Sequence, residues 1–515
     1  MTRRPDIILL VLDAQRADRL SCYGCPIETS PQLDVLAAEA TLFAHAVTPA
    51  QWTIPSHASM FTGLYPSQHT MFQQESVLPA ALPTLAERLQ QAGYFTAGFS
   101  NNPLVGILKN GLRRGFDSFL SYGGLLTLQP NQAGASTGLP GHSRQGFRRV
   151  LVKLLSRIQN TMAHSHVVRK YWFSPLIVPL WQTALRIKGN LKGDTGLTLT
   201  DAARLLIERR GMVSGRPVFC FINLMGTHVP FDPPRWAVER FAPQVRRSLA
   251  ARAFLWRFNA RIYHWLGPLP DVLDPERKAI LDGLYNAEVA AQDRQVGIFL
   301  ERLRAAGVLD QTLLMVVADH GEHLGEKQLL GHAFSAYEEL IHVPLLIRDP
   351  LGDLPRGATL TSFVSTRRLF HTALAAAGAA TPTEEALTLA QVNLGDPDQG
   401  VVFAEAEPLQ SAVRLIECRR PGLLQALGYD QPHRAVYSGV HKLIAADQRH
   451  VELYAVRDDP TESVDLQQVL PEKVERLRGH LHDFVQQTRA SSAVVAQHEE
   501  DLFVRQRLEA LGYLE

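Results

Sequence analysis

The chain has 515 residues, 46% of them hydrophobic, and a formal net charge of +1. This length predicts more than one folded unit, whereas the near-zero charge points to no class of partner, and we expect no nucleic acid. Four cysteines are too few for a disulfide framework in a chain this long. The first apolar run, residues 7–12, is too short for a signal peptide or a membrane span, which predicts a cytoplasmic protein.

The first part of the chain alternates expected strands and helices. Residues 7–12 are continuously apolar, which is typical of a parallel strand buried on both faces. A serine and a proline predict the start of a helix over 31–40, and a capping box predicts a second helix over 84–93. Residues 94–99 read as the next strand. This alternation is typical of an α/β fold with a mostly parallel sheet.

Further strands are expected over 218–224, 312–318 and 343–347, with a long helix over 275–305. We therefore expect residues 1–355 to form a large catalytic α/β domain, in which helices flank a mostly parallel central sheet.

The pattern changes after about residue 355. Residues 363–379 read as helical, and residues 436–444 and 451–456 read as a hairpin. These elements predict a smaller C-terminal α+β domain over 356–515.

Two basic stretches, at about 122–200 and 240–270, interrupt the α/β pattern. No acidic residue lies between Asp117 and Asp194, and aromatic residues are interleaved with the basic ones in both stretches. One hypothesis is an amphipathic surface that contacts an anionic membrane or a lipid-linked glycan, which would make the protein peripheral to a membrane. The alternative is a pair of solvated helical inserts that pack on the core.

Polar residues follow the expected strands directly. Asp13 follows the first strand, Asp319 and His320 follow the strand over 312–318, and His228 lies on the loop after 218–224. Ligands of open α/β sheets bind at the carboxyl ends of strands, so Asp13, Asp319 and His320 could meet at one divalent cation. Two carboxylates with one imidazole favour Mn²⁺ or Zn²⁺, with Ca²⁺ as the alternative.

A short helix over about 55–63 follows Thr53, with a proline in its first turn and a glycine at its end. An anionic ester suits such a helix N-terminus, and a hydroxyl beside a metal can act as a nucleophile. Thr53 could also be a fourth metal ligand, although an ordinary capped helix is the alternative. The loop histidines His228 and His332 could orient the oxyanion and protonate the leaving oxygen.

These motifs resemble those of the sulfatases, which belong to the alkaline phosphatase superfamily. The shared motifs, in chain order, are Asp13, Cys22-Tyr23-Gly24, Pro55-Ser56, Thr62-Gly63, Thr227-His228, Asp319-His320-Gly321-Glu322, His342-Val343-Pro344-Leu345, Glu452-Leu453-Tyr454 and Asp459-Pro460. The resemblance implies a sulfatase-like alkaline phosphatase fold, with Asp13, Asp319 and His320 as metal ligands. It also implies that Thr53 is the nucleophile and His228 an active-site histidine.

Several positions depart from the family pattern. Thr53 occupies the position of the cysteine or serine that becomes formylglycine, and threonine cannot undergo that conversion, so we expect no formylglycine. His57 replaces the arginine of the signature, and Ala14 replaces a second aspartate. The lysine expected near Asn101 is missing, and His332 stands where another lysine is usual. The pocket has therefore lost much of its fixed positive charge.

The remaining one-metal set resembles the phosphonate monoester hydrolase and phosphodiesterase branch, in which Tyr94 and Thr96 would be pocket residues. We expect Tyr94, Thr96 and Asn101 to bind substrate. Catalytic roles are expected for Thr53, His57, His228 and His332.

The expected function is metal-dependent hydrolysis of a sulfate or phosphate ester. The alternatives are a phosphodiesterase or phosphonate monoester hydrolase, a transferase that passes a phospho-headgroup to a lipid or glycan, and an inactive relative that only binds a ligand.

Overall fold

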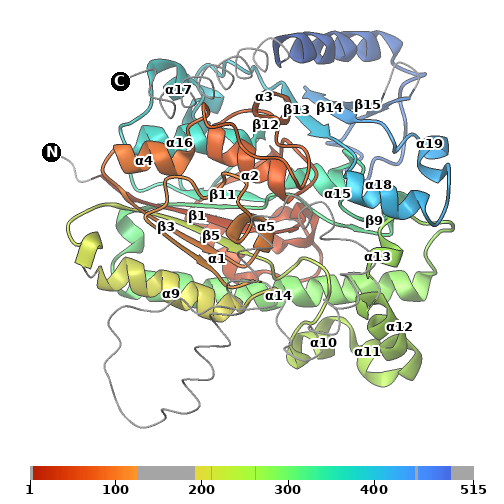
Figure 1. Ribbon diagram of the computed structural model, residues 1–515, viewed down its shortest axis with the longest axis horizontal. Helices are drawn as coiled ribbons and strands as arrows, with labels where there is room; N and C mark the ends of the chain where they lie inside the picture. The colour runs from red at the N-terminus through yellow and green to blue at the C-terminus, as the bar shows by residue number, and fades with distance from the viewer. Residues whose placement is uncertain (1–3, 124–191, 210, 261, 447–449, 489–515) are drawn as a thin grey trace, which may run out of the picture.

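A computed structural model describes residues 4–123, 192–209, 211–260, 262–446 and 450–488. Its centre is a nine-stranded sheet with the order β10-β2-β11-β7-β1-β5-β3-β4, in which β12 also pairs with β2. Helices cover both faces of this sheet (Figure 1). This architecture confirms the expected α/β fold with helices on both faces of a mostly parallel central sheet.

The middle of the sheet is parallel, as the apolar runs predict. Its strands are β1 (Asp6–Leu12), β3 (Phe95–Ser100), β4 (Ser118–Ser121), β5 (Val218–Leu224) and β7 (Thr312–Val317). Strand β1 lies between β5 and β7 and is parallel to both. The chain segments that follow β1, β5 and β7 therefore emerge at one edge of the sheet.

One side of the sheet is mixed. Its strands are β2 (Thr41–Val47), β10 (His342–Val343), β11 (Leu345–Arg348) and β12 (Ala358–Ser365). Strand β11 is antiparallel to β2 and β7, whereas β12 is parallel to β2. The expected helix over 363–379 is wrong at its start, because the β-branched run of β12 continues to Ser365 and α16 begins only at Leu369.

Helices form a layer on each face of the sheet (Figure 1). One layer holds α1 (Pro31–Ala37), α9 (Thr195–Glu208) and α14 (Pro275–Ala305). The other holds α2 (Thr53–Thr62), α4 (Leu85–Gln91) and α16 (Leu369–Ala376). Every residue of β1 is buried because both of its faces are covered, and this explains its continuous apolar run.

Several short helices lie between the longer elements. They are α3 (Pro66–His69), α5 (Pro103–Gly106), α10 (Arg235–Phe241), α15 (Glu338–Ile341), α17 (Pro382–Ala386), α18 (Gln410–Glu417) and α19 (Leu423–Leu427). A small sheet of three strands joins β6 (Gly267–Pro268), β9 (Leu329–Gly331) and β8 (His323–Leu324) in the order β6-β9-β8.

A separate antiparallel sheet lies toward the C-terminus. Its strands are β13 (Val402–Ala406), β14 (His433–Ser438), β15 (His441–Ala445) and β16 (Val451–Tyr454). The expected single strand over 436–444 is wrong, because the chain turns at Gly439, where φ is 68°, and divides it between β14 and β15. Strand β15 then pairs antiparallel with β16, which confirms the second half of the expected hairpin. Residues 471–488 are helical. The domain boundary at residue 355 stays a prediction, and β12, which follows it, pairs with the central sheet.

The first basic stretch falls mainly on residues 124–191, which lie outside the described residues. The second stretch forms α11 (Pro243–Arg247), α12 (Leu249–Ala260) and α13 (Ile262–Trp265). Among the described ranges, no helix combines the length and the apolar character needed to cross a bilayer. The cytoplasmic location stays a prediction.

Candidate active site

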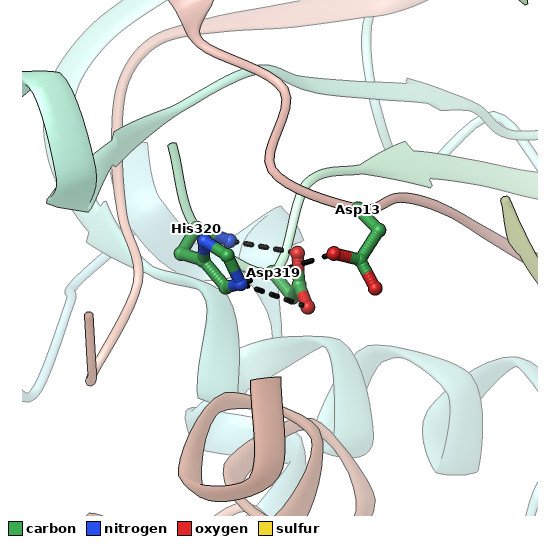
Figure 2. A group of neighbouring side chains, drawn as sticks. All are labelled: Asp13, Asp319 and His320. Atoms are coloured by element: carbon green, nitrogen blue, oxygen red, sulfur yellow. Dashed lines mark hydrogen bonds and ion pairs between the residues drawn. The ribbon is translucent and has the colours of Figure 1, made fainter. Parts of the chain in front are cut away.

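Three candidate metal ligands meet at the carboxyl edge of the central sheet. Asp13 follows β1, and Asp319 and His320 follow the neighbouring strand β7, so the three side chains converge (Figure 2). One ligand atom from each residue lies within 4.8 Å of the other two. Nε2 of His320 is 3.6 Å from Oδ2 of Asp319 and 3.9 Å from Oδ1 of Asp13. All three residues are fully buried.

Each aspartate leaves one oxygen without a hydrogen bond among the described residues. These atoms are Oδ1 of Asp13 and Oδ2 of Asp319, whereas the second oxygen of each carboxylate is well bonded. Oδ2 of Asp13 accepts from Nδ2 of Asn102 at 2.7 Å, and Oδ1 of Asp319 accepts from the backbone N–H of Ala14 at 3.1 Å. An unpaired buried carboxylate oxygen is costly, so a divalent cation between the two fits this donor set.

The orientation of His320 also fits metal binding. Its Nδ1 lies 2.8 Å from the carbonyl oxygen of Gly321, which can only accept a hydrogen bond. The proton is therefore assigned to Nδ1, and the Nε2 lone pair faces the carboxylates. Burial lowers the pKa of His320 to about 3, which keeps the imidazole neutral at pH 7.

The two carboxyl groups influence each other. Burial raises the pKa of Asp319 well above its ordinary value, and the charge of Asp13 raises it further. Burial also acts to raise the pKa of Asp13, but the facing imidazoles of His228 and His320 and the amide of Asn102 outweigh it, so that pKa is lowered. Two adjacent buried carboxyl groups do not readily ionise together unless a cation offsets their charge.

Thr53 is the first residue of α2, not the residue before the helix as the sequence predicted, because Trp52 occupies the N-cap position. Its hydroxyl is buried beside the metal-ligand cluster. Oγ1 of Thr53 is 3.3 Å from Nε2 of His320 and 3.4 Å from Nδ2 of Asn102. The hydroxyl is therefore close enough to coordinate the same cation as His320, or to attack an ester bound there.

His228 and His332 lie at the same site. The ring of His332 is 5.0 Å from that of His228 and 4.4 Å from that of His320, measured between centroids. Nδ1 of His332 is 3.0 Å from Oε1 of Glu322, and Nδ1 of His228 is 2.5 Å from the carbonyl oxygen of Val229. Each Nδ1 thus has an acceptor, which leaves each Nε2 for another partner.

The electrostatics of these residues follow from their burial. Burial lowers the pKa of His332 to about 4 and also lowers that of His228, where the neighbouring His332 adds to the effect. Burial raises the pKa of Glu322 to about 7. The imidazoles are therefore neutral at pH 7 in the absence of a bound anion.

His57 lies in α2 one helical turn after Thr53 and contacts two residues of the site. Its Nδ1 is 2.9 Å from the carbonyl oxygen of Thr53 and 3.5 Å from Oδ2 of Asp319. Its Nε2 is 3.4 Å from Nδ2 of Asn223, and the side chain is fully buried. These contacts are those of a residue that supports Thr53 and Asp319, so a direct catalytic role for His57 stays a prediction.

The expectation that Tyr94 and Thr96 bind substrate is wrong. Tyr94 directly precedes β3 and Thr96 is its second residue. The Tyr94 hydroxyl donates to the carbonyl of Pro5 at 3.0 Å, and the Thr96 hydroxyl donates to that of Gly115 at 2.6 Å. Because β3 runs in the same direction as β1, these residues lie at the edge opposite Asp13. A strand of this length separates the two edges by about 20 Å.

Asn101 and Asn102 both follow β3, but they have different partners. Oδ1 of Asn101 accepts from the hydroxyl of Thr198 at 2.7 Å, which directs it to α9. Asn102, which the sequence analysis missed, donates to Asp13 and Thr53. Substrate binding by Asn101 therefore lacks support from these contacts, and the amide that reaches the cluster comes one residue later.

Two more residues of the site were missed as candidates. Asn223 donates to Oδ2 of Asp13 at 3.3 Å, and Glu322 accepts from His332. Asn223 is the single polar residue of the otherwise apolar strand β5, next to its carboxyl end, and that placement was a usable signal. Glu322 stood within the Asp-His-Gly-Glu motif but had received no role.

The sulfatase family model matches residues 5–379 of the chain. The chain belongs to the sulfatase family. Among characterised sulfatases, an ulvan-active sulfatase of Formosa agariphila is 25% identical over 371 residues, which are 70% of this chain and 60% of that protein. The steryl-sulfatase of Mus musculus is 26% identical over 424 residues, which are 75% of this chain and 64% of that protein. The match thus spans less than two thirds of each of these sulfatases.

Solved structures show the same fold at low identity. The phosphonate monoester hydrolase of Agrobacterium radiobacter has a TM-score of 0.62 and 21% identity, with 95% of this chain and 96% of that chain covered. A protein solved with its substrate D-glucosamine-2-N,6-O-disulfate has a TM-score of 0.63 and 17% identity, with 95% and 99% covered. At these identities the likeness shows the fold alone.

Proposed function

We propose that this sulfatase-family chain is a metal-dependent hydrolase of anionic esters, with sulfate esters as its first substrate class and Thr53 as its nucleophile. One observation carries the proposal. The Thr53 hydroxyl lies 3.3 Å from Nε2 of His320, beside two carboxylates that each leave one oxygen unpaired among the described residues. Family membership and the relatives that are named sulfatases support the ester-hydrolase activity.

The donor set supports one divalent cation held by Asp13, Asp319 and His320, with Thr53 within reach as a fourth ligand. Two carboxylate oxygens and one imidazole nitrogen favour Mn²⁺ or Zn²⁺, and Ca²⁺ is the alternative. When bound, such a cation lowers the pKa of a neighbouring hydroxyl and offsets negative charge on ester oxygens.

In the proposed reaction, Oγ1 of Thr53 attacks the sulfur of the bound ester as its hydroxyl proton passes to Nε2 of His332 or His228, because each neutral imidazole holds its own proton on Nδ1. The new Oγ1–S bond forms as the bond from sulfur to the leaving oxygen breaks, and the imidazolium formed gives that proton from its Nε2 to the leaving oxygen. Water then attacks sulfur, which releases sulfate and returns the hydroxyl to Thr53. The amide of Asn102, 3.4 Å from Oγ1, orients the nucleophile.

Glu322 positions His332 in this scheme. Its carboxylate accepts from Nδ1 of His332 at 3.0 Å, which directs Nε2 toward the site and stabilises the imidazolium that donates the proton. The lysine that most family members have at this position carries its charge permanently, whereas His332 carries charge only while it holds the transferable proton.

Charge favours singly negative esters as substrates. Among the described residues, no lysine or arginine forms an ion pair with the carboxylates of Asp13, Asp319 or Glu322. One divalent cation with neutral imidazoles compensates a sulfate monoester, a phosphodiester or a phosphonate monoester better than a doubly charged phosphate monoester. Hydrolysis of a phosphodiester or phosphonate monoester is therefore the second candidate function. The structural similarity to a phosphonate monoester hydrolase agrees with this candidate.

Threonine also keeps the transferase alternative open. A formylglycine hydrate has a second hydroxyl that can expel the sulfate, but an ester on Thr53 lacks one, so it must be displaced by water or by an acceptor alcohol. A lipid or glycan alcohol in the place of water would give a transferase. An inactive binding relative is the remaining alternative, and a purified protein without stoichiometric metal would favour it.

The test is hydrolysis of aryl sulfate, aryl phosphodiester and aryl phosphonate esters in the presence of Mn²⁺, Zn²⁺ or Ca²⁺. We expect wild type and Thr53→Ser to turn over the ester, and Thr53→Ala to lose about a thousandfold or more in kcat. Full activity of Thr53→Ala would reject the nucleophile assignment. No turnover of any ester by metal-loaded wild type would reject the hydrolase and favour the transferase or the inactive relative.

A further inference from the structure

Helix α12 (Leu249–Ala260) has one face that is anchored to the protein. Ala251, Phe254 and Phe258 are buried on this inner face. The ring of Phe254 packs edge-on against Trp265 at 5.6 Å, and the guanidinium of Arg277 in α14 lies 5.7 Å from the same ring. The helix is therefore held in place by α13 and α14, and its opposite side faces outward.

The outer side of α12 exposes large apolar side chains. Leu249 is 76% exposed and Trp256 is 60% exposed. Arg252 lies between them at helical spacing, so the three residues share one side of the helix. Large apolar residues exposed together on an otherwise well-packed helix indicate an interaction surface.

The charge of this region is strongly biased. No acidic residue lies between Glu239 and Asp271 in the sequence. The exposed side chains of α11 and α12 make up what we call the arginine–tryptophan face: Arg246, Arg247, Leu249, Arg252, Trp256 and Arg257. Within the described ranges, Arg247, Arg252 and Arg257 form no ion pair, and Arg246 has only the exposed Glu239 at 3.8 Å.

We propose that the arginine–tryptophan face docks on an anionic lipid surface. The arginines complement acidic headgroups, and Trp256 suits the interface between headgroups and acyl chains. Leu249 favours lipid over a sulfated glycan, because an exposed aliphatic side chain gains from acyl chains but little from a hydroxylated polymer. The helix would lie in the plane of the surface, with its inner face on the protein.

The position of α12 connects this surface with the candidate active site. The chain passes from α12 through α13 to β6, and Gly267 of β6 pairs with Leu330 of β9. His332 follows β9 directly. Figure 1 shows α12 beside α13 on the side of the molecule where β9 lies. Docking through this face would therefore hold the candidate site near the lipid surface.

Co-sedimentation of the full chain with vesicles tests the proposal without any use of activity, so it stands apart from the proposed hydrolase function. The vesicles contain phosphatidylcholine with or without phosphatidylserine, at low and at physiological salt. We expect binding only to the phosphatidylserine vesicles, weakened by salt. The double substitution R252Q/R257Q should weaken binding about fivefold for each arginine, and L249S/W256A roughly tenfold.

The chain offers a matched control in Leu394, which is also 76% exposed but lies after the segment 389–393, far along the chain from α12. Leu394→Ser should leave vesicle binding unchanged, and thermal unfolding should show that all variants fold. The proposal is overturned if wild type does not bind phosphatidylserine vesicles, or if the α12 variants bind as wild type does. Binding to a soluble sulfated polysaccharide without vesicle binding would identify the face as a glycan-docking surface and would also overturn it.

Discussion

One buried aspartate begins strand β1 and another directly follows it, and the two have different partners. At the amino end, Asp6 accepts from the backbone N–H of Val218 at 2.9 Å and is paired with Arg209. At the carboxyl end, Asp13 leaves Oδ1 unpaired among the described residues, and Asp319 beside it leaves Oδ2 unpaired. The first arrangement is complete within the protein, whereas the second leaves two carboxylate oxygens available to a cation.

This difference shows how a functional carboxylate is recognised in a structure. Burial alone does not distinguish Asp6 from Asp13, since they are 6% and 0% exposed. Buried polar groups are normally satisfied, so paired groups account for stability and the unpaired ones need a partner from outside the chain. We therefore expect substitutions at the carboxyl end of β1 to lower activity, and substitutions at its amino end to lower stability.

The largest effect is expected at the carboxyl end. Asp319→Asn removes one of two carboxylates, so we expect loss of stoichiometric metal and a decrease of about a thousandfold or more in kcat/KM. The metal-free fold should keep its stability, because burial and the charge of Asp13 raise the pKa of Asp319 and an amide oxygen can accept the same backbone hydrogen bonds. Metal analysis and an ester-hydrolysis assay of the purified variant check this. A variant that keeps both metal and activity would show that Asp319 is not a metal ligand.

A smaller effect is expected from Glu322→Gln, which removes the charge that positions His332. Esters with a poor leaving group need a proton from His332, so their kcat should fall by about tenfold to a hundredfold. Activated aryl esters, whose leaving oxygen needs no proton, should react nearly as in wild type. A series of esters that differ in leaving-group pKa checks this. An equal loss for all esters would show that Glu322 has only a structural role.

At the amino end, Asp6→Asn should affect stability and leave the chemistry unchanged. The substitution leaves Arg209 without its charged partner, so we expect a decrease of about 1–3 kcal/mol in the free energy of unfolding. Metal content and activity per folded molecule should match wild type. Urea unfolding measures the free energy of unfolding, and metal analysis with an ester-hydrolysis assay measures metal content and activity. Loss of metal in this variant would show that the two ends are not independent.

The smallest effect concerns pH and a buried histidine away from both ends. Burial lowers the pKa of His69 to about 3, from 6.5 in a free side chain. The unfolded chain therefore binds a proton below pH 6.5 that the folded chain does not, so stability is full above this pH and falls as pH falls. The slope is about 1.4 kcal/mol per pH unit.

His69→Gln removes this contribution. Denaturant unfolding between pH 7 and pH 5 should therefore show a shallower pH dependence in the variant, by about that slope below pH 6.5. An identical pH dependence in both proteins would mean that His69 is protonated in the fold.

The sequence predicted the site residues that directly follow apolar strands. Asp13, Asp319 and His320 were found because each comes immediately after a continuous buried run, and parallel strands place such residues at one edge. Thr53 was a candidate from its place before a short helix, the resemblance to sulfatases strengthened its role as nucleophile, and the structure places it beside the three ligands. The central sheet was predictable for the same reason, because its strands are apolar on both faces.

The errors came from positions that the apolar pattern does not determine. Asn101 was named and Asn102 was missed. Both follow β3, and only the path of the chain beyond the strand decides which amide reaches Asp13. Tyr94 and Thr96 were taken from the resemblance, although their place at the start of a parallel strand puts them at the wrong edge. The direction of the strand was sufficient to exclude them.

The central claim is that Thr53 attacks the ester beside the metal ligands, and covalent labelling tests it most directly. Metal-loaded enzyme is mixed with the ester that it turns over fastest, quenched in acid during turnover and analysed by mass spectrometry of its peptides. We predict that the peptide with Thr53 gains one sulfuryl or phosphoryl group, and that Thr53→Ala shows no label. Turnover by the wild-type enzyme without a label on Thr53, or with a label on another residue, would contradict the claim.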